Sequence, residues 1–164
     1  MKINWLIPII GLCLAGSAYA LDYNAVVTKH PSGNHQYKTL TAAIAAAPGS
    51  SSSHFYIYVK NGIYKEKINL KTKNVSIIGQ SQQDTVIGYE AAAGQTNSNG
   101  EKWGTSGSYV LSVNASNVEL KNLTIKNTFD YLTNDAKSSS DSTKISSSQA
   151  VALLIGTDAK KLKM

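Results

Sequence analysis

The chain has 164 residues, of which 42% are hydrophobic, and its formal net charge of +6 rests on lysine because the sequence contains no arginine. The lysines are scattered singly and no nucleic-acid-reading motif is present, which argues against a nucleic-acid-binding protein. The positive charge suits an acidic polymer such as a polyuronate, although it also serves plain solubility.

The first twenty residues, MKINWLIPIIGLCLAGSAYA, have the pattern of a secretory signal peptide, with small residues at Ala18 and Ala20 before the cleavage point. The apolar stretch is short for a membrane span. We therefore expect a secreted protein, extracellular or, in a bacterium, periplasmic, with no membrane segment after cleavage. Cys13 lies inside the signal, so the mature chain 21–164 has no cysteine, which excludes disulfides and thiol catalysis.

A short amphipathic helix is predicted near the start of the mature chain, after a polar lead with one strand candidate at 25–27. Thr39 can cap this helix and Pro48 can end it. The apolar residues between them fall on one helical face, namely Leu40, Ala43, Ile44 and Ala47. The helix should therefore bury one side, while PGSSSS after it forms a loop.

From His54 onward, short β-branched and aromatic runs alternate with turns, which predicts an all-β domain. The runs lie at 55–59, 67–70, 75–79, 84–88, 108–113, 118–125 and 150–156. Many are apolar at successive positions, as expected for strands that are covered on both faces. In 118–125, Val118, Leu120, Leu123 and Ile125 can point inward. The pattern fits a solenoid, but it fits a sandwich or jelly roll nearly as well.

Asparagine recurs at the edges of these runs, although it is depleted in ordinary strands. The residues concerned are Asn74, Asn114, Asn117, Asn122 and Asn127. In a parallel β-helix, turn asparagines can stack from coil to coil and bond backbone groups that the bends leave unpaired. Three of them, Asn74, Asn114 and Asn122, are also N-glycosylation sequons, which matter only in a host that glycosylates exported proteins.

Two long polar stretches, 91–107 and 129–148, separate the later strands, and loops of this length tend to be functional. In the first, Trp103 stands beside flexible backbone and two hydroxyls. That arrangement suits a sugar ring, but it equally suits a loop that is anchored by a buried Trp. In the second, Asp135 and Asp141 resemble at best a weak calcium site, so we predict no metal site.

No catalytic residue follows from these patterns. The histidines, His30, His35 and His54, all lie in the first third of the chain, and no G-x-S-x-G motif accompanies them. Glu119 and Asp130 flank one strand, and surface positions are expected for both carboxylates. We predict no cofactor.

Five segments resemble, in order and spacing, the N-terminal half of the pectinesterases. They are AVVTKHPSGNHQYKTLTAAIAAAP, FYIYVKNGIYKEKINL, NVSIIGQSQQDTVI, LKNLTIKNT and QAVALLIG. The two long loops, the first with GEKWGTSGS, resemble the bacterial branch more than the plant branch. The resemblance implies a right-handed parallel β-helix of the pectin lyase-like type, capped by the helix at 39–47. It also implies a carboxylic ester hydrolase that removes methyl esters from polygalacturonate.

The resemblance further implies two substrate-binding residues, Gln149 at the start of QAVAL and Thr105 in WGTSG. The family's two catalytic aspartates, its oxyanion-stabilising glutamine and its arginine belong to motifs such as GYQDTLY and GTVDFIFG, and neither motif occurs here. We therefore expect 21–164 to be the N-terminal part of a C-terminally truncated pectinesterase β-helix that binds methyl-esterified pectin (homogalacturonan), and a monomer if complete. The alternative is a non-catalytic secreted protein that binds pectin or the cell wall.

Overall fold

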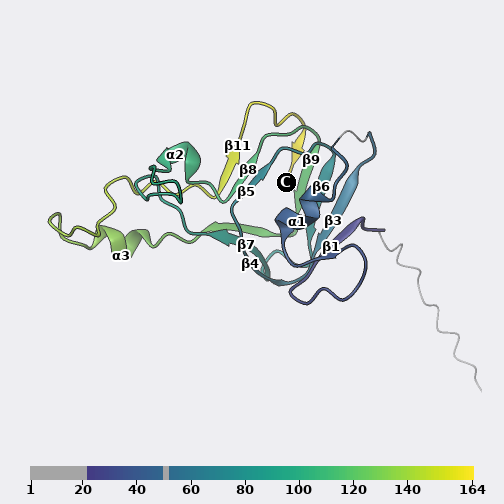
Figure 1. The fold of residues 1–164 in the computed structure, drawn as a ribbon, viewed down its shortest axis with the longest axis horizontal. Helices are drawn as coiled ribbons and strands as arrows, with labels where there is room; N and C mark the ends of the chain where they lie inside the picture. The colour runs from purple at the N-terminus through teal and green to yellow at the C-terminus, as the bar shows by residue number, and fades with distance from the viewer. Residues whose placement is uncertain (1–21, 50–51) are drawn as a thin grey trace, which may run out of the picture.

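Three parallel β-sheets run side by side through the molecule and enclose its core (Figure 1). The computed structural model describes residues 22–49 and 52–164, so the predicted signal peptide at 1–20 lies outside the described residues. The strand orders are β12-β9-β6-β3-β1-β2, β10-β7-β4 and β11-β8-β5. Successive strands of the chain therefore join the three sheets in turn, which is the arrangement of a parallel β-helix and confirms the predicted solenoid.

The strands are short, as a solenoid with a bend at every corner requires. The chain opens with β1 (Ala25–Val27) and β2 (Gln36–Tyr37) in the first sheet. Three coils follow, each with one strand in every sheet: β3 (Phe55–Val59), β4 (Gly62–Lys65) and β5 (Ile68–Leu70); β6 (Val75–Gly79), β7 (Thr85–Tyr89) and β8 (Leu111–Val113); β9 (Val118–Lys121), β10 (Thr124–Asn127) and β11 (Leu153–Ile155). Finally, β12 (Leu162–Lys163) pairs with β9.

The core consists of apolar side chains that recur at the same place in successive coils. Ile57 pairs in register with Ile77, and Ile77 with Leu120, and all three are buried. Tyr64 is also buried, and its hydroxyl donates to the carbonyl of Lys60 at 2.8 Å. Each such aliphatic side chain contributes about 1.5–3 kcal/mol on burial. A slip of one residue would turn the whole set outward, so this stacking fixes the register.

The predicted helix is α1 (Leu40–Ala45), and it packs against β1, β2 and β3 at one end of the stack. The Thr39 hydroxyl accepts from the backbone N–H of Ala42 at 3.2 Å, as an N-cap does. The predicted face is buried, namely Leu40, Ala43, Ile44 and Ala47. A second cap could not be seen in the sequence: the Glu66 carboxylate accepts from the backbone N–H groups of Leu40 and Thr41 at 2.8 and 2.9 Å. No helix in the described part of the chain is long and apolar enough to cross a membrane.

Asparagines stack between coils at the corners, as the sequence predicts. The side-chain amide of Asn117 donates to the Asn74 side-chain oxygen at 2.8 Å, and both residues have a positive φ, 57° and 58°. In another corner, the Asn114 amide donates to the Asn69 oxygen at 3.0 Å. Asparagine tolerates this left-handed conformation better than most residues, so it can turn the chain and link two coils at once.

The predicted run at 118–125 is not one strand. Asn122, with a φ of 52°, divides it into β9 and β10, which belong to different sheets. Val118 and Leu120 are buried as expected, whereas Leu123 and Ile125 are only half-buried against the core. The alternation continues across the bend because both strands direct alternate residues into the same interior.

A tight contact between coils at Gly79 provides a test of this packing. A Cβ atom on Gly79 would lie 2.1 Å from the backbone oxygen of Asn122 in the next coil. Since a backbone carbonyl cannot rotate away, we expect Gly79→Ala to lower the free energy of unfolding by about 1–3 kcal/mol in urea titrations. Gly49→Ala is the control, because nothing lies within 4 Å of its added Cβ. Equal urea midpoints for the two variants would contradict the close contact between Gly79 and Asn122.

Candidate functional site

Two insertions leave the solenoid at the same corner, between the second and third sheets. The first, 90–110, joins β7 to β8 and contains α2 (Gly104–Gly107), and the second, 128–152, joins β10 to β11 and contains α3 (Tyr131–Asp135). Figure 1 shows both projecting to one side of the stack. Because β7 and β10 are paired neighbours, the insertions start from adjacent coils and lie against each other.

One half-buried amide joins the roots of both insertions. The Asn127 side-chain nitrogen lies 2.9 Å from the carbonyl oxygens of Ala91 and Ser108 and 3.1 Å from that of Val151. Its side-chain oxygen accepts from the backbone N–H of Phe129 at 3.1 Å. Asn127 thus contacts both ends of the first insertion and both ends of the second.

Further out, the two insertions are hydrogen-bonded to each other. The N–H of Ala93 donates to the carbonyl of Gln149 at 2.9 Å, and that of Gly94 donates to Ser147 at 2.7 Å. The carbonyl of Ala93 accepts from the N–H of Gly104 at 2.9 Å. Ala93 therefore bonds on one side to Gln149 and on the other to the residue before Thr105.

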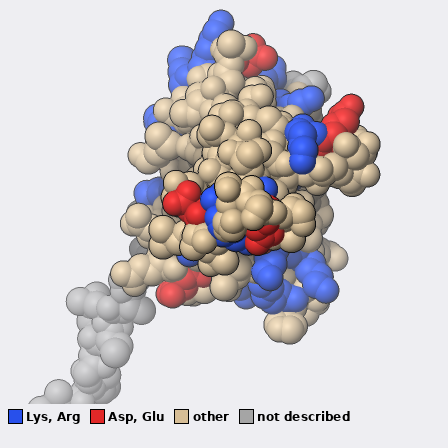
Figure 2. Space-filling view, turned by 90° about the vertical axis from the view of Figure 1, so that its left-hand side faces the viewer, with Lys and Arg blue, Asp and Glu red and all other residues tan. Residues whose placement is uncertain are grey.

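Thr105 and Gln149, the two substrate-binding residues expected from the resemblance, line the same cavity. The cavity has a volume of about 550 Å³, and both side chains are exposed to it. Apart from Ile145, its other walls are small or polar, namely Ala93, Gly94, Lys102, Gly104, Ser142, Lys144, Ser146 and Ser147. On this side of the molecule, lysine and acidic side chains are interspersed with a broad uncharged surface (Figure 2). The structure thus brings together two residues that the sequence places in separate loops.

The second insertion, expected to be a loop, has internal order of its own. The Asn134 side chain is buried and bonds the backbone of Ile145 twice, accepting from its N–H at 2.8 Å and donating to its carbonyl at 2.9 Å. Asp130 caps α3, and the hydrogen bonds from Thr133 lower the pKa of its carboxyl. These bonds hold the start of the segment that leads to Gln149.

No metal site is found at Asp135 and Asp141. The Asp141 carboxylate accepts from the N–H and the hydroxyl of Thr143, both at 2.7 Å, and these bonds lower its pKa. Within residues 22–49 and 52–164, no group of three or more His, Cys, Asp or Glu side chains could hold an ion.

Trp103 is an anchor of the first insertion. The tryptophan is half-buried, and the ammonium of Lys67 lies 4.4 Å from the centre of its ring. One face of the indole is therefore occupied by a side chain of the solenoid, so the anchor interpretation of WGTSG fits better than a free sugar platform.

His54 contacts a serine and, through it, a carboxylate, but the arrangement is not that of a nucleophile and its base. Its Nε2 lies 2.8 Å from the Ser76 hydroxyl, which donates to Glu119 at 2.9 Å. Ser76 is fully buried and already bonded to the carboxylate, so it cannot meet a substrate. Glu119 is half-buried rather than at the surface, whereas Asp130 is exposed as expected. His30 and His35 are exposed as well.

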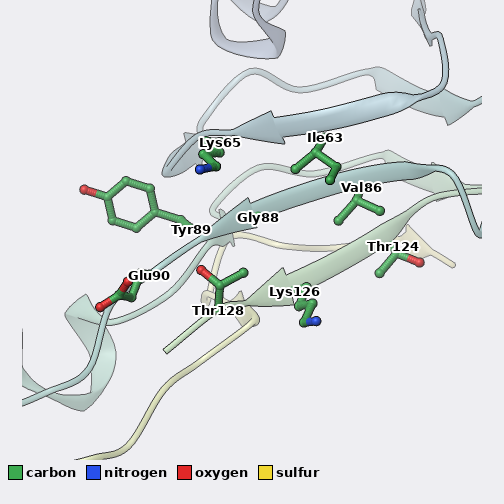
Figure 3. Close-up of a pocket in the computed structure, with 9 residues that line it drawn as sticks. All are labelled: Ile63, Lys65, Val86, Gly88, Tyr89, Glu90, Thr124, Lys126 and Thr128. Atoms are coloured by element: carbon green, nitrogen blue, oxygen red, sulfur yellow. The ribbon is translucent and has the colours of Figure 1, made fainter. Parts of the chain in front are cut away.

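A second cavity, of about 590 Å³, lies on the outer face of the second sheet (Figure 3). Ile63 and Val86 form its floor, and Gly88 lies in register between Lys65 and Lys126. Neither Thr105 nor Gln149 lines it. The candidate site is therefore the cavity between the insertions.

The family model for pectinesterases matches residues 24–162 of this chain. The chain belongs to the pectinesterase family. Pectinesterase A of Dickeya dadantii (strain 3937) is 42% identical over 150 residues, which cover 89% of this chain and 41% of the relative. This pectinesterase chain thus spans about two fifths of that relative's length.

Solved structures agree with the sequence comparison. The pectin methylesterase PemA from Erwinia chrysanthemi superimposes with a TM-score of 0.82 at 42% identity, covering 87% of this chain and 42% of the other. A pectin methylesterase in complex with a hexasaccharide matches with the same TM-score of 0.82, identity of 42%, and coverage of 87% and 42%.

Removing the amide at the root of the insertions should loosen both of them. We expect Asn127→Ala to destabilise the protein by about 1–3 kcal/mol, because several backbone groups lose their partner. Hydrogen exchange should speed up at 91–94 and at 147–151. Asn99→Ala, at an exposed turn of the first insertion, is the matched control and should leave exchange at these amides unchanged. If the exchange rate of Asn127→Ala rises in one insertion and not in the other, Asn127 does not join the two insertions.

Proposed function

We propose that this chain forms the pectin-binding part of an exported pectin methylesterase, an aspartyl esterase that hydrolyses the methyl esters of polygalacturonate. One observation carries the proposal: Thr105 and Gln149 come from separate insertions and line one cavity. The complex of a related pectin methylesterase with a hexasaccharide supports the same class of ligand. Export and a monomeric state are parts of the same proposal.

The chemistry of the cavity suits a sugar polymer. The Gln149 amide can donate and accept at once, and the Thr105 hydroxyl can do the same, so both can bond the hydroxyls and the ester of a galacturonate ring. Ala93 and Gly94, which line the cavity together with Thr105 and Gln149, are small and leave room for a sugar ring. Lys102, an exposed ammonium at the cavity, would attract the free carboxylate of a residue that has lost its methyl group.

The contribution of these residues to the reaction is binding and orientation. A polymer that is held on both sides of a reacting ester presents that ester in one position, and such positioning lowers the entropic part of the barrier. The family uses a pair of aspartates for the chemical step, and no residue of this sequence is assigned to that pair. We therefore propose no acid, base or nucleophile among the residues described here.

Pectin binding by the full chain tests the proposal. We expect it to bind partially methyl-esterified pectin, and Gln149→Ala to bind roughly three- to tenfold more weakly, as the loss of one neutral hydrogen bond predicts. Isothermal titration calorimetry measures both affinities. Gln82→Ala, an exposed glutamine in the turn between β6 and β7, is the matched control and should bind like the wild type.

Methanol release tests whether the described chain carries out the chemical step itself. The absence of arginine and of the GYQDTLY-type motif favours a chain that binds pectin without hydrolysing it. We expect no methanol from methyl-esterified pectin in the presence of the purified chain. Methanol release would place the catalytic groups within this sequence, and a failure to bind pectin would reject the site itself.

A further inference from the structure

We propose that Lys67 is a positioning residue that holds Thr105 on the wall of the cavity, an inference that rests on the proposed function. Lys67 belongs to the solenoid and does not line the cavity. It would act on the substrate only through the first insertion.

The Lys67 ammonium is enclosed by the first insertion and the strand beside it. It donates to the backbone carbonyls of Gly107 and Tyr109, both at 2.5 Å. Three aromatic rings surround it, with their centres 3.7 Å (Tyr109), 4.4 Å (Trp103) and 5.9 Å (Tyr89) from the nitrogen. The rings come from β7 and from both sides of α2. A single side chain therefore hydrogen-bonds to the last residue of α2 and to the backbone after it, and contacts the ring of the residue before it.

The place of Lys67 in the coil explains this contact. Glu66 and Lys67 are the whole turn between β4 and β5, at the corner where the next two coils carry their insertions. The short turn leaves space into which the first insertion folds back. Glu66 points toward α1 and caps it, while Lys67 points toward α2. One two-residue turn thus holds the end cap and the insertion.

Thr105 is fixed from both sides by these bonds. On one side, Gly104 donates to Ala93 at 2.9 Å, which ties α2 to the residue whose N–H bonds to Gln149. On the other side, Lys67 holds Gly107, two residues after Thr105, and the Ser108 hydroxyl donates to the Thr105 carbonyl at 2.8 Å. Without Lys67, α2 would lose its hydrogen bond to the solenoid turn at 66–67, although Gly104 would still bond to Ala93 and Ser108 to Asn127.

The charge of Lys67 makes the contact sensitive to pH. Burial lowers the pKa of Lys67 to about 8, and the titratable groups among its contacts are Tyr89 and Tyr109. Because closing the insertion over Lys67 lowers its pKa, the closed form binds a proton less readily than an open one. Closure should therefore strengthen as the pH rises through 8 toward 10.5, the ordinary value. Below pH 8, the buried charge opposes closure while the hydrogen bonds and the aromatic rings favour it.

The test uses the full chain, with Lys67→Met and Lys67→Arg. Methionine keeps the packing against the rings but cannot donate, and arginine can donate but does not titrate. We expect Lys67→Met to raise the exchange rate of amides 104–110 and to weaken binding of methyl-esterified pectin roughly tenfold. Lys67→Arg should recover part of the affinity. Lys65→Met, an exposed lysine two residues earlier, is the matched control and should match the wild type.

A pH series from 7 to 9 distinguishes positioning from a merely structural role. Pectin affinity of the wild type should rise by up to about tenfold across this range, while both Lys67 variants stay flat. Unchanged hydrogen exchange at 104–110 in Lys67→Met would show that Lys67 does not hold α2. Faster exchange with unchanged pectin affinity would show that holding α2 does not position Thr105 for binding. A pH profile shared by the wild type and Lys67→Arg would also overturn the proposal. If the wild type binds no pectin, the proposed function fails together with this positioning role. The exchange rates of amides 104–110 still show whether Lys67 holds α2.

Discussion

The in-register pairing of successive coils is the constraint on which the rest of this molecule depends. Each strand exchanges hydrogen bonds with the same strand of the coil before and the coil after, as Phe55 with Val75 and Val75 with Val118. Residues cannot be added within a strand without breaking this register. Extra length is therefore admitted only at corners, and here it is concentrated at one corner in two adjacent coils. The cavity with Thr105 and Gln149 is a consequence of that stacking.

The corners themselves are stabilised by polar side chains that work between coils. Asn117 bonds to Asn74, Asn114 bonds to Asn69, and Asn127 bonds to the roots of both insertions. Among the described residues, every buried side-chain nitrogen and oxygen has a hydrogen-bond partner. Since an unsatisfied buried polar group costs about 1–3 kcal/mol, these amides allow sharp bends in a chain without disulfides.

The proposed binding surface is attached to this frame rather than built into it. Its residues stand on insertions, and its geometry depends on few contacts: Ala93 between the insertions, Asn127 at their roots and Lys67 beneath α2. Loops that are held by a rigid scaffold are where proteins commonly place binding residues. The charge of the molecule is mixed on this face, so recognition of an acidic polymer would rest on local groups such as Lys102 rather than on a large positive field (Figure 2).

Several features of this protein could be read from the sequence because they depend on local patterns. The cap and buried face of α1 follow from Thr39 and the helical spacing of Leu40 and Ile44, and the turn asparagines follow from their positions at strand edges. The choice of a solenoid over a sandwich, and the pairing of Thr105 with Gln149, came from the resemblance to a family. Periodicity could not supply them, because alternate residues point inward in either fold.

Only the tertiary structure decided which residues far apart in the chain contact each other. The division of 118–125 into β9 and β10, the cap of α1 by Glu66 and the enclosure of Lys67 by three rings have no sequence signature. The first arises from the bend at Asn122, and the other two arise because coil stacking places the turn at 66–67 beside both α1 and α2. The sequence by itself determined where most of the strands form and where the chain is long enough for insertions, because both depend on local patterns. The stacking of coils determined which side chains meet, because register acts between coils and not along them.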